Sequence, residues 1–263
     1  MTGRVKSLMR GLLPRTIRSR VILAGPLRGY RIVTSWHDYP AAITGRTERP
    51  LLDWFAENVK PGETWLDVGA HYGYTAIALS RLVGASGRVF AFEPMISTAG
   101  YVMQTRRLND LPQLTVVPLG LANPETGALE MRRLPTVRGM VDSTVREGGW
   151  GETIMVASLD WLWPRLCGTE EELHGIKVDV QGMELEALGG MIGILSRWKP
   201  KLVVEVHVDV DRAGLLGAIE SAGYVRRGEP IESVAGEIEP LYVDNHSYAF
   251  FPVEGVVHSK PNL

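Results

Sequence analysis

Acidic side chains and glycines stand at the spacing of a nucleotide-type site near the middle of the first half of the chain. Asp67 precedes Gly69 and Gly73 within residues 64–74, and a short apolar run comes before them. An apolar strand, a glycine turn and a helix together form a ligand pocket at the carboxyl edge of a sheet. Dinucleotide sites favour G-x-G-x-x-G, and the second glycine of that pattern is absent here.

The carboxylate of Asp67 indicates which nucleotide this turn accepts. It would repel a pyrophosphate and attract the ammonium and sulfonium groups of S-adenosylmethionine (SAM), which carries no phosphate. Glu93 ends the next apolar run, a position from which an acidic side chain accepts hydrogen bonds from both ribose hydroxyls. The pattern favours SAM over NAD, and the alternative is that both carboxylates only cap helices. We expect SAM to contact Asp67, Gly69, Ala70, His71, Gly73, Tyr74, Thr75, Glu93, Pro94 and Leu121.

Four polar side chains interrupt two later apolar runs near their carboxyl ends. Lys177 and Asp179 are two residues apart, as are Glu205 and His207, so each pair shares one face of its strand. Buried charges are costly unless they are paired or bind a ligand. If the two strands are neighbours, as right-handed crossovers allow, the four groups meet beside the cofactor.

We therefore predict that Asp179, His207, Glu205 and Lys177 are the catalytic residues. Asp179 would orient a methyl acceptor or bind a divalent cation, and His207 would remove a hydroxyl proton. Asp179, Glu205 and His207 would alternatively hold a metal ion, although their spacing is not a metal signature, so no metal is assigned. A further alternative is a purely structural network. Glu184, in the first turn of the following helix, is expected to cap it.

The order of apolar runs predicts one α/β domain, doubly wound around a mostly parallel sheet, with an antiparallel strand near one edge. We expect the central strands at 65–68, 88–94, 114–118, 175–180 and 201–207, and the antiparallel strand at 247–251. Other predicted elements are a strand at 129–134, a closing strand at 224–225, and helices at 97–109, capped by Ser97, and at 183–197.

Composition limits the function classes. The chain has 263 residues, 45% hydrophobic and 22% charged, and a net charge of −2, which does not favour nucleic-acid binding. Its single cysteine, Cys167, excludes an intrachain disulfide and is typical of a reducing compartment. No apolar run reaches the roughly 18 residues of a membrane span, so we expect a cytoplasmic protein.

Two segments lie outside the central pattern. Residues 1–46 are expected to form an appendage with a basic amphipathic helix and a strand, and residues 47–263 the catalytic domain. The helix would contact anionic lipid at the membrane periphery, or dock on the domain as the simpler alternative. The Gly-, Arg- and Ser/Thr-rich stretch 135–151 is expected to be a loop that covers the substrate.

Several spaced motifs together resemble the FkbM-type methyltransferases. They occupy residues 65–74, 89–94, 158–160, 176–184 and 203–207. The resemblance implies a Rossmann-like class I fold and a SAM-dependent O-methyltransferase that acts on hydroxyls of sugars, glycolipids or related natural products. Family members commonly have Glu where Gln181 stands and a small residue at Met183. A charge-dependent role of that Glu would be lost here, whereas a role in the turn would be kept.

Three other functions remain open at the level of sequence: a SAM-binding module without catalysis, a methyltransferase for another small molecule, and an NAD-type oxidoreductase. Nucleic-acid methylation is disfavoured by the charge balance. We expect a small-molecule, glycan or glycolipid acceptor as the partner, and a homo-oligomer is compatible with the sequence.

Overall fold

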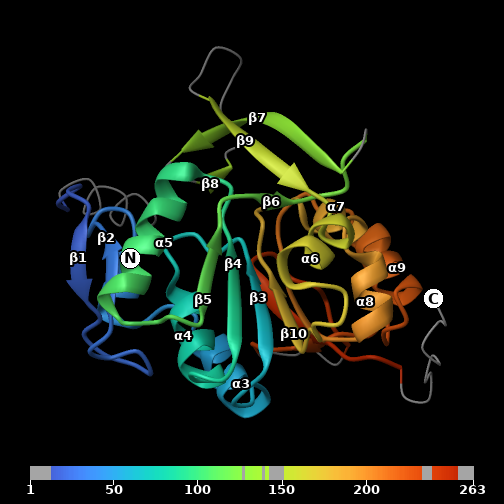
Figure 1. Cartoon of the computed structure of the whole chain (residues 1–263), viewed down its shortest axis with the longest axis horizontal. Helices are drawn as coiled ribbons and strands as arrows, with labels where there is room; N and C mark the ends of the chain where they lie inside the picture. Colours follow the sequence, from blue (N-terminus) through green and yellow to red (C-terminus); the bar gives the residue numbers. More distant parts are fainter. Residues whose placement is uncertain (1–12, 126–127, 138–139, 142–150, 233–238, 254–263) are drawn as a thin grey trace.

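The computed structural model describes residues 13–125, 128–137, 140–141, 151–232 and 239–253, and its centre is a seven-stranded sheet (Figure 1). The strands are β3 (Thr64–Val68), β4 (Arg88–Phe92), β5 (Leu114–Val117), β10 (Gly175–Val178), β11 (Lys201–Val206), β12 (Glu229–Pro230) and β13 (His246–Phe250). Their order is β12-β13-β11-β10-β3-β4-β5. β13 runs antiparallel to both of its neighbours, β11 and β12. The strands β11, β10, β3, β4 and β5 are parallel to one another. The predicted Rossmann-like α/β fold, with an antiparallel strand near one edge, is confirmed.

Helices cover both faces of the sheet because its strands are apolar on both sides. One face packs against α6 (Leu159–Cys167), α7 (Glu184–Gly189), α8 (Ile192–Trp198) and α9 (Arg212–Ser221). The other packs against α3 (Arg49–Asn58), α4 (Tyr74–Val83) and α5 (Ile96–Leu108). In β3, Leu66 and Val68 belong to the first core and Trp65 to the second, which is the period of two expected of a strand. Asp67 lies on the same face as Trp65.

The N-terminal part of the described chain is a small hairpin and a short helix. It contains β1 (Arg18–Val21), β2 (Arg31–Thr34) and α2 (Pro40–Thr44), with β1 and β2 antiparallel. The backbone N–H of Val33 donates to Thr105 Oγ1 of α5 at 2.9 Å. Ile22 and Leu27 join the same apolar core as α3 and α4. The predicted basic helix falls on residues 1–12, outside the described residues.

A second sheet forms an arm that crosses the main domain at the top of Figure 1. It contains β6 (Gly120–Leu121), β7 (Leu129–Val137), β8 (Met140–Val141) and β9 (Gly151–Ala157), in the order β6-β9-β7-β8. The prediction of a loop over 135–151 is wrong for residues 135–137, 140–141 and 151, because β7 stays paired with β9 as far as Pro135 and Gly151. Residues 138–139 and 142–150 of that prediction lie outside the described part.

The single helix predicted over 183–197 is two helices, α7 and α8. A side chain at Gly190 could not fit, because a Cβ there would lie 1.9 Å from the carbonyl oxygen of Ala122. Asp160 then starts the second helix, since its carboxylate accepts the backbone N–H of Ile194 at 2.7 Å. At this break, the end of α7 packs against Ala122 in the segment that follows β6.

Two smaller predictions also change. The helix predicted over 97–109 begins at Ile96 with Met95 at its N-cap, so Ser97 does not cap it. The closing strand predicted at 224–225 is a single bridge between Tyr224 and Pro252. Within the described residues, no helix is long and apolar enough to cross a bilayer.

Candidate active site

A cavity of about 780 Å³, including its open mouth, lies at the carboxyl ends of β3 and β4; we call it the cofactor cavity. Gly69, His71, Glu93, Asp179 and Gln181 supply its polar lining. Its apolar lining consists of Val68, Phe92, Pro94, Met95, Leu121, Ile154, Val156, Val180 and Met183. A largely apolar cavity with a few polar groups is typical of small-molecule and cofactor sites.

Glu93 is one of the two carboxylates that line this cavity; the other is Asp179. Glu93 is 4% exposed, and its two oxygens accept the backbone N–H groups of His71 at 2.8 Å and Met95 at 3.0 Å. Burial raises the pKa of Glu93 to about 8. Each carboxylate oxygen keeps a second lone pair, so the side chain can still accept from hydroxyl donors in the cavity.

The glycine turn after β3 brings three strand ends together. Gly69 has φ of 80° and packs so closely on the loop after β10 that a Cβ would lie 1.8 Å from the carbonyl oxygen of Asp179. The backbone N–H groups of Gly69 and Ala70 both donate to the carbonyl of Phe92, at 3.0 Å. Only glycine tolerates this backbone and this approach, so the turn fixes the position of β10 relative to β3.

Asp67 lies beneath the cavity, fully buried. Its carboxylate accepts the Thr75 hydroxyl at 2.7 Å and lies 3.2 Å from Lys177 Nζ. The same ammonium group lies 3.2 Å from Asp179 and donates to the carbonyl of Gly69 at 3.2 Å. Burial alone lowers the pKa of Lys177, but Asp179 and Asp67 outweigh burial and raise it, so the side chain stays charged. Asp67 thus has a cationic partner within the protein.

A second, smaller cavity adjoins the first; we call it the inner chamber. Gly69, His71 and Asp179 line both cavities. Tyr74 and Glu48 line the inner chamber but not the cofactor cavity. Tyr74 is 2% exposed, and neither its hydroxyl nor His71 Nε2 has a hydrogen-bond partner in the described part of the chain. Burial lowers the pKa of His71 to about 4, so its imidazole is neutral at pH 7. The chamber therefore presents unused polar atoms to an occupant.

Glu48 joins the inner chamber to a third, polar cavity, the polar groove. Its other lining residues are Arg46, Thr47, Leu51, Glu205, Ile231, Glu232, Asn245 and Ser247. The pKa of Glu48 is raised to about 7. Burial is the largest cause, Lys177 opposes the rise, and the charges of Glu205 and Asp179 add to it. Glu48 also has φ of 53°, a strained conformation for a residue other than glycine. Neighbouring cavities in this series share lining residues, so the three are adjacent, from the cofactor cavity to the groove.

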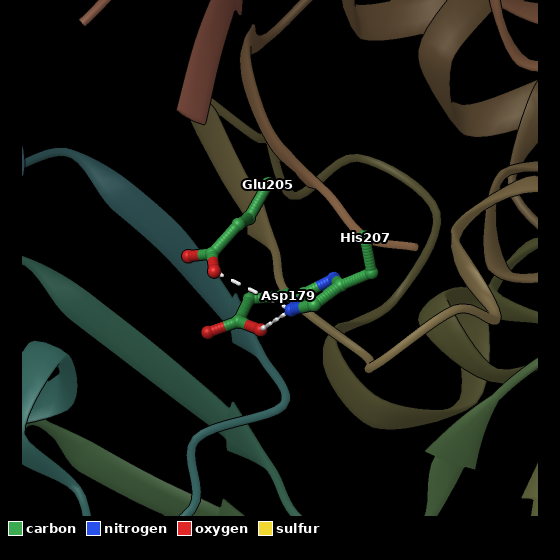
Figure 2. A group of neighbouring side chains, drawn as sticks. All are labelled: Asp179, Glu205 and His207. Atoms are coloured by element: carbon green, nitrogen blue, oxygen red, sulfur yellow. Dashed lines mark ion pairs between the residues drawn. The ribbon is translucent and has the colours of Figure 1, made fainter. Parts of the chain in front are cut away.

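His207 lies among carboxylates, and its side chain points toward those of Asp179 and Glu205 (Figure 2). Its Nε2 is 3.5 Å from Asp179 Oδ1 and 3.3 Å from Glu205 Oε1, and its Nδ1 is 2.7 Å from Glu184 Oε1. The amide nitrogen of Gln181 lies 2.9 Å from the same Nε2. The predicted meeting of the two polar pairs is correct, because β10 and β11 are parallel neighbours.

The carboxylates change the titration of this imidazole. Burial lowers the pKa of His207, but hydrogen bonds to Glu184 and Glu205 and the charge of Asp179 raise it to about 10. The predicted role of His207 as a base depends on a pKa near neutrality, and His207 does not have such a pKa in this environment. Conversely, burial raises the pKa of Asp179, but Lys177 and His207 together hold it below its usual value.

Glu184 does not act as a simple helix cap. It is fully buried, and one oxygen accepts the backbone N–H of Gly182 at 3.1 Å while it also meets His207 Nδ1. The predicted capping role misses this second contact. Helix position alone could not reveal it, because His207 comes from a different strand.

The predicted cofactor residues divide between the cavities. Gly69, His71, Glu93, Pro94 and Leu121 line the cofactor cavity. Ala70, Tyr74 and Thr75 line the inner chamber but not the cofactor cavity. Asp67 and Gly73 line neither of these two cavities. The sequence analysis missed Met95, Ile154, Val156, Val180 and Met183 in the cofactor cavity, and Tyr39 and Glu48 in the chamber. In β9, the alternation of side chains between the two faces of the strand could have indicated two of them, since Ile154 and Val156 are buried and Met155 is exposed.

Three known proteins are similar to this chain in sequence or in fold. Hexuronic acid methyltransferase AglP from Haloferax volcanii is 30% identical over 168 residues, which cover 63% of this chain and 65% of AglP. The match thus spans less than two thirds of AglP. The crystal structure of Methyltransferase FkbM from Methylobacillus flagellatus KT is 19% identical, with a TM-score of 0.49 over 75% of this chain and 50% of that one. Fibrillarin from Aeropyrum pernix, with bound SAM, is 13% identical, with a TM-score of 0.49 over 90% and 88%.

A family model identifies the family of this chain. The Methyltransferase FkbM domain matches residues 67–226, more than half of the chain. The matched segment begins at Asp67 and contains Glu93, Asp179, Glu205 and His207. The chain belongs to the FkbM methyltransferase family.

Proposed function

We propose that this protein transfers the methyl group of SAM to a hydroxyl oxygen of a sugar, glycolipid or related natural product. The observation that carries the proposal is the set of residues that two adjacent cavities share. Gly69, His71 and Asp179 line both the cofactor cavity and the inner chamber, so a methyl donor in one can face an acceptor in the other.

SAM would occupy the cofactor cavity. Glu93 would accept the ribose hydroxyls, while Leu121, Ile154 and Val156 would contact the adenine as apolar surface. Asp67 supports this arrangement from below, because it holds Lys177 and Thr75 rather than lining the cavity. The sulfonium would then lie near the turn at Gly69.

The acceptor would occupy the inner chamber and the polar groove. Carboxylates, an arginine, an amide and hydroxyl groups line this space, which suits a ligand with many hydroxyls. AglP acts on a hexuronic acid according to its name, and this favours a sugar-type acceptor for the present chain.

The chemistry follows from this placement. As the acceptor oxygen forms its bond to the methyl carbon, the carbon–sulfur bond breaks, and S-adenosylhomocysteine leaves with the electron pair on sulfur. The hydroxyl proton passes to a carboxylate oxygen of the Asp179–Glu205–His207 cluster. Most of the rate enhancement would come from alignment of oxygen, methyl carbon and sulfur in one line.

Two measurements test the proposal. Calorimetry with S-adenosylhomocysteine should show binding to the full chain, and Glu93→Ala should weaken it at least tenfold. Transfer of label from methyl-labelled SAM to glycan, glycolipid or small-molecule extracts should then identify the acceptor. NAD binding without S-adenosylhomocysteine binding would refute the proposal. The blank for the transfer assay is the same extract incubated with methyl-labelled SAM and heat-inactivated enzyme.

A further inference from the structure

We propose that His207, Asp179 and Glu205 bind a first-row divalent cation at the junction of the inner chamber and the polar groove. The site deepens the proposed function, because the ion would lie where the acceptor hydroxyl is expected. Its binding can be measured without any methyl transfer.

The distances between the ligand atoms match a shared ion. One nitrogen and two carboxylate oxygens all lie within 4.8 Å of one another, and His207 Nε2 is 3.5 Å from Asp179 Oδ1 and 3.3 Å from Glu205 Oε1. An ion about 2.1 Å from each ligand separates neighbouring ligands by about 3.0 Å in octahedral and about 3.4 Å in tetrahedral geometry. The two distances from His207 Nε2 are close to these values, and the three side chains point toward one another (Figure 2).

Glu184 orients the imidazole as metal sites require. Metal-binding histidines generally donate their second ring N–H to a carboxylate, which fixes the tautomer and turns the other nitrogen to the ion. His207 Nδ1 meets the fully buried Glu184 at 2.7 Å, and Nε2 faces Asp179 and Glu205. The contact between Glu184 and His207 is therefore a second observation, separate from the distances between the three ligand atoms.

Lys177 leaves one oxygen of Asp179 available. The ammonium group lies 3.2 Å from Oδ2, whereas Oδ1 faces His207. The amide of Gln181 lies 3.3 Å from the same Oδ1 and 2.9 Å from His207 Nε2. Rotation of this amide would present its oxygen as a fourth, neutral ligand.

The charge balance of the corner also favours a cation. Among the described residues, four carboxylates, those of Asp67, Asp179, Glu184 and Glu205, share two basic side chains, Lys177 and His207. The unpartnered buried hydroxyl of Tyr74 and Nε2 of His71 in the adjoining chamber point independently to a polar occupant. Two carboxylates and one imidazole suit ions such as Mn²⁺ and Zn²⁺. An ion here would acidify a hydroxyl that binds to it.

Titration of the chelator-treated full chain with Mn²⁺, followed by the electron paramagnetic resonance signal of the free ion, tests the site. We expect one bound Mn²⁺ per chain, at least 30-fold weaker binding in His207→Ala and Glu205→Gln, and about tenfold weaker binding in Glu184→Gln. Glu232→Gln is the matched control, because this exposed carboxylate on the groove lies outside the cluster; its affinity should stay within twofold.

Calorimetry with S-adenosylhomocysteine on the same variants separates the two proposals and shows that each variant is folded. Retained S-adenosylhomocysteine binding with no Mn²⁺ or Zn²⁺ binding in the unmodified chain overturns the ion site and leaves the proposed function standing. Mn²⁺ binding that the cluster variants weaken, without S-adenosylhomocysteine binding, supports the ion site and refutes the proposed function. Equal Mn²⁺ affinity in Glu205→Gln and Glu232→Gln overturns the ion site.

Discussion

Replacing Lys177 with Met tests the charge arrangement beneath the cofactor cavity. The substitution keeps an unbranched side chain of similar length and removes the ammonium group that lies 3.2 Å from both Asp67 and Asp179. Asp67 has no exposed surface, so it cannot regain water, and the Thr75 hydroxyl remains its hydrogen-bond donor. Asp179 is partly exposed and can be solvated.

Breaking a buried ion pair by removing one partner costs about 3–5 kcal/mol. We take about 3 kcal/mol, because one of the two carboxylates can be rehydrated. With a urea m-value of about 3 kcal/mol per M for a chain of this size, the unfolding midpoint of Lys177→Met should fall by about 1 M. The double variant Asp67→Asn/Lys177→Met should recover at least half of that loss, because no uncompensated charge stays buried.

The control is Arg49→Met, which breaks an exposed pair with Asp53 at 2.8 Å and should leave the midpoint unchanged. The reasoning is refuted if Lys177→Met shifts the midpoint no more than this control does, or if the double variant is no more stable than the single one. The double variant also separates two roles of Asp67. If Asp67 acts by holding Lys177, affinity for S-adenosylhomocysteine should change less than threefold, whereas a direct contact with the cofactor ammonium would lower it far more.

Three further outcomes follow from individual contacts. Gly69→Ala should destabilise the protein by at least ~2 kcal/mol in urea unfolding, beyond the effect of Gly29→Ala, since both have positive φ but only Gly69 lacks room for a Cβ. Adenosine, which has no ionisable group near neutral pH, should bind about tenfold more weakly at pH 7 than at pH 9. The reason is that Glu93, with a pKa raised to about 8, must lose its proton to accept the ribose hydroxyls; Glu93→Gln should abolish this pH dependence in calorimetry. Arg132→Ala should speed amide exchange in β7 and β9 by mass spectrometry, because Arg132 joins β7 to Glu186 of α7; unchanged exchange would show that strand pairing alone holds the arm.

The central sheet was predictable because its signals are local. Each strand is a short apolar run, and the turn after β3 has glycine at two of its three positions of positive φ, Gly69 and Gly73, with His71 at the third. Lys177 and Asp179 violated the apolar pattern of a buried strand, and this alone indicated a polar site at the carboxyl ends. Parallel pairing of β10 with β11 then followed from the right-handed crossover rule.

The arm and the chamber were not predictable in the same way. The chain returns from β7 to β9 through a segment rich in glycine and polar residues, and its composition is that of a loop. The strands form because each finds its backbone partner in the other, which is a tertiary cause rather than a local preference. The apolar wall formed by Ile154 and Val156 follows from that pairing, so it could not be located before the sheet was known.

The character of the polar corner depends on residues that no local pattern joins. Glu48 precedes α3, Glu184 begins α7, and His207 follows β11, yet these segments meet around Asp179. An isolated histidine would titrate near neutral pH and serve as a base. Among these carboxylates, the pKa of His207 rises to about 10, and the imidazole becomes the partner of an excess negative charge. The residue types at β10 and β11 thus indicated that chemistry occurs here, but the carboxylates around His207, which come from separate segments, set how strongly this site attracts positive charge.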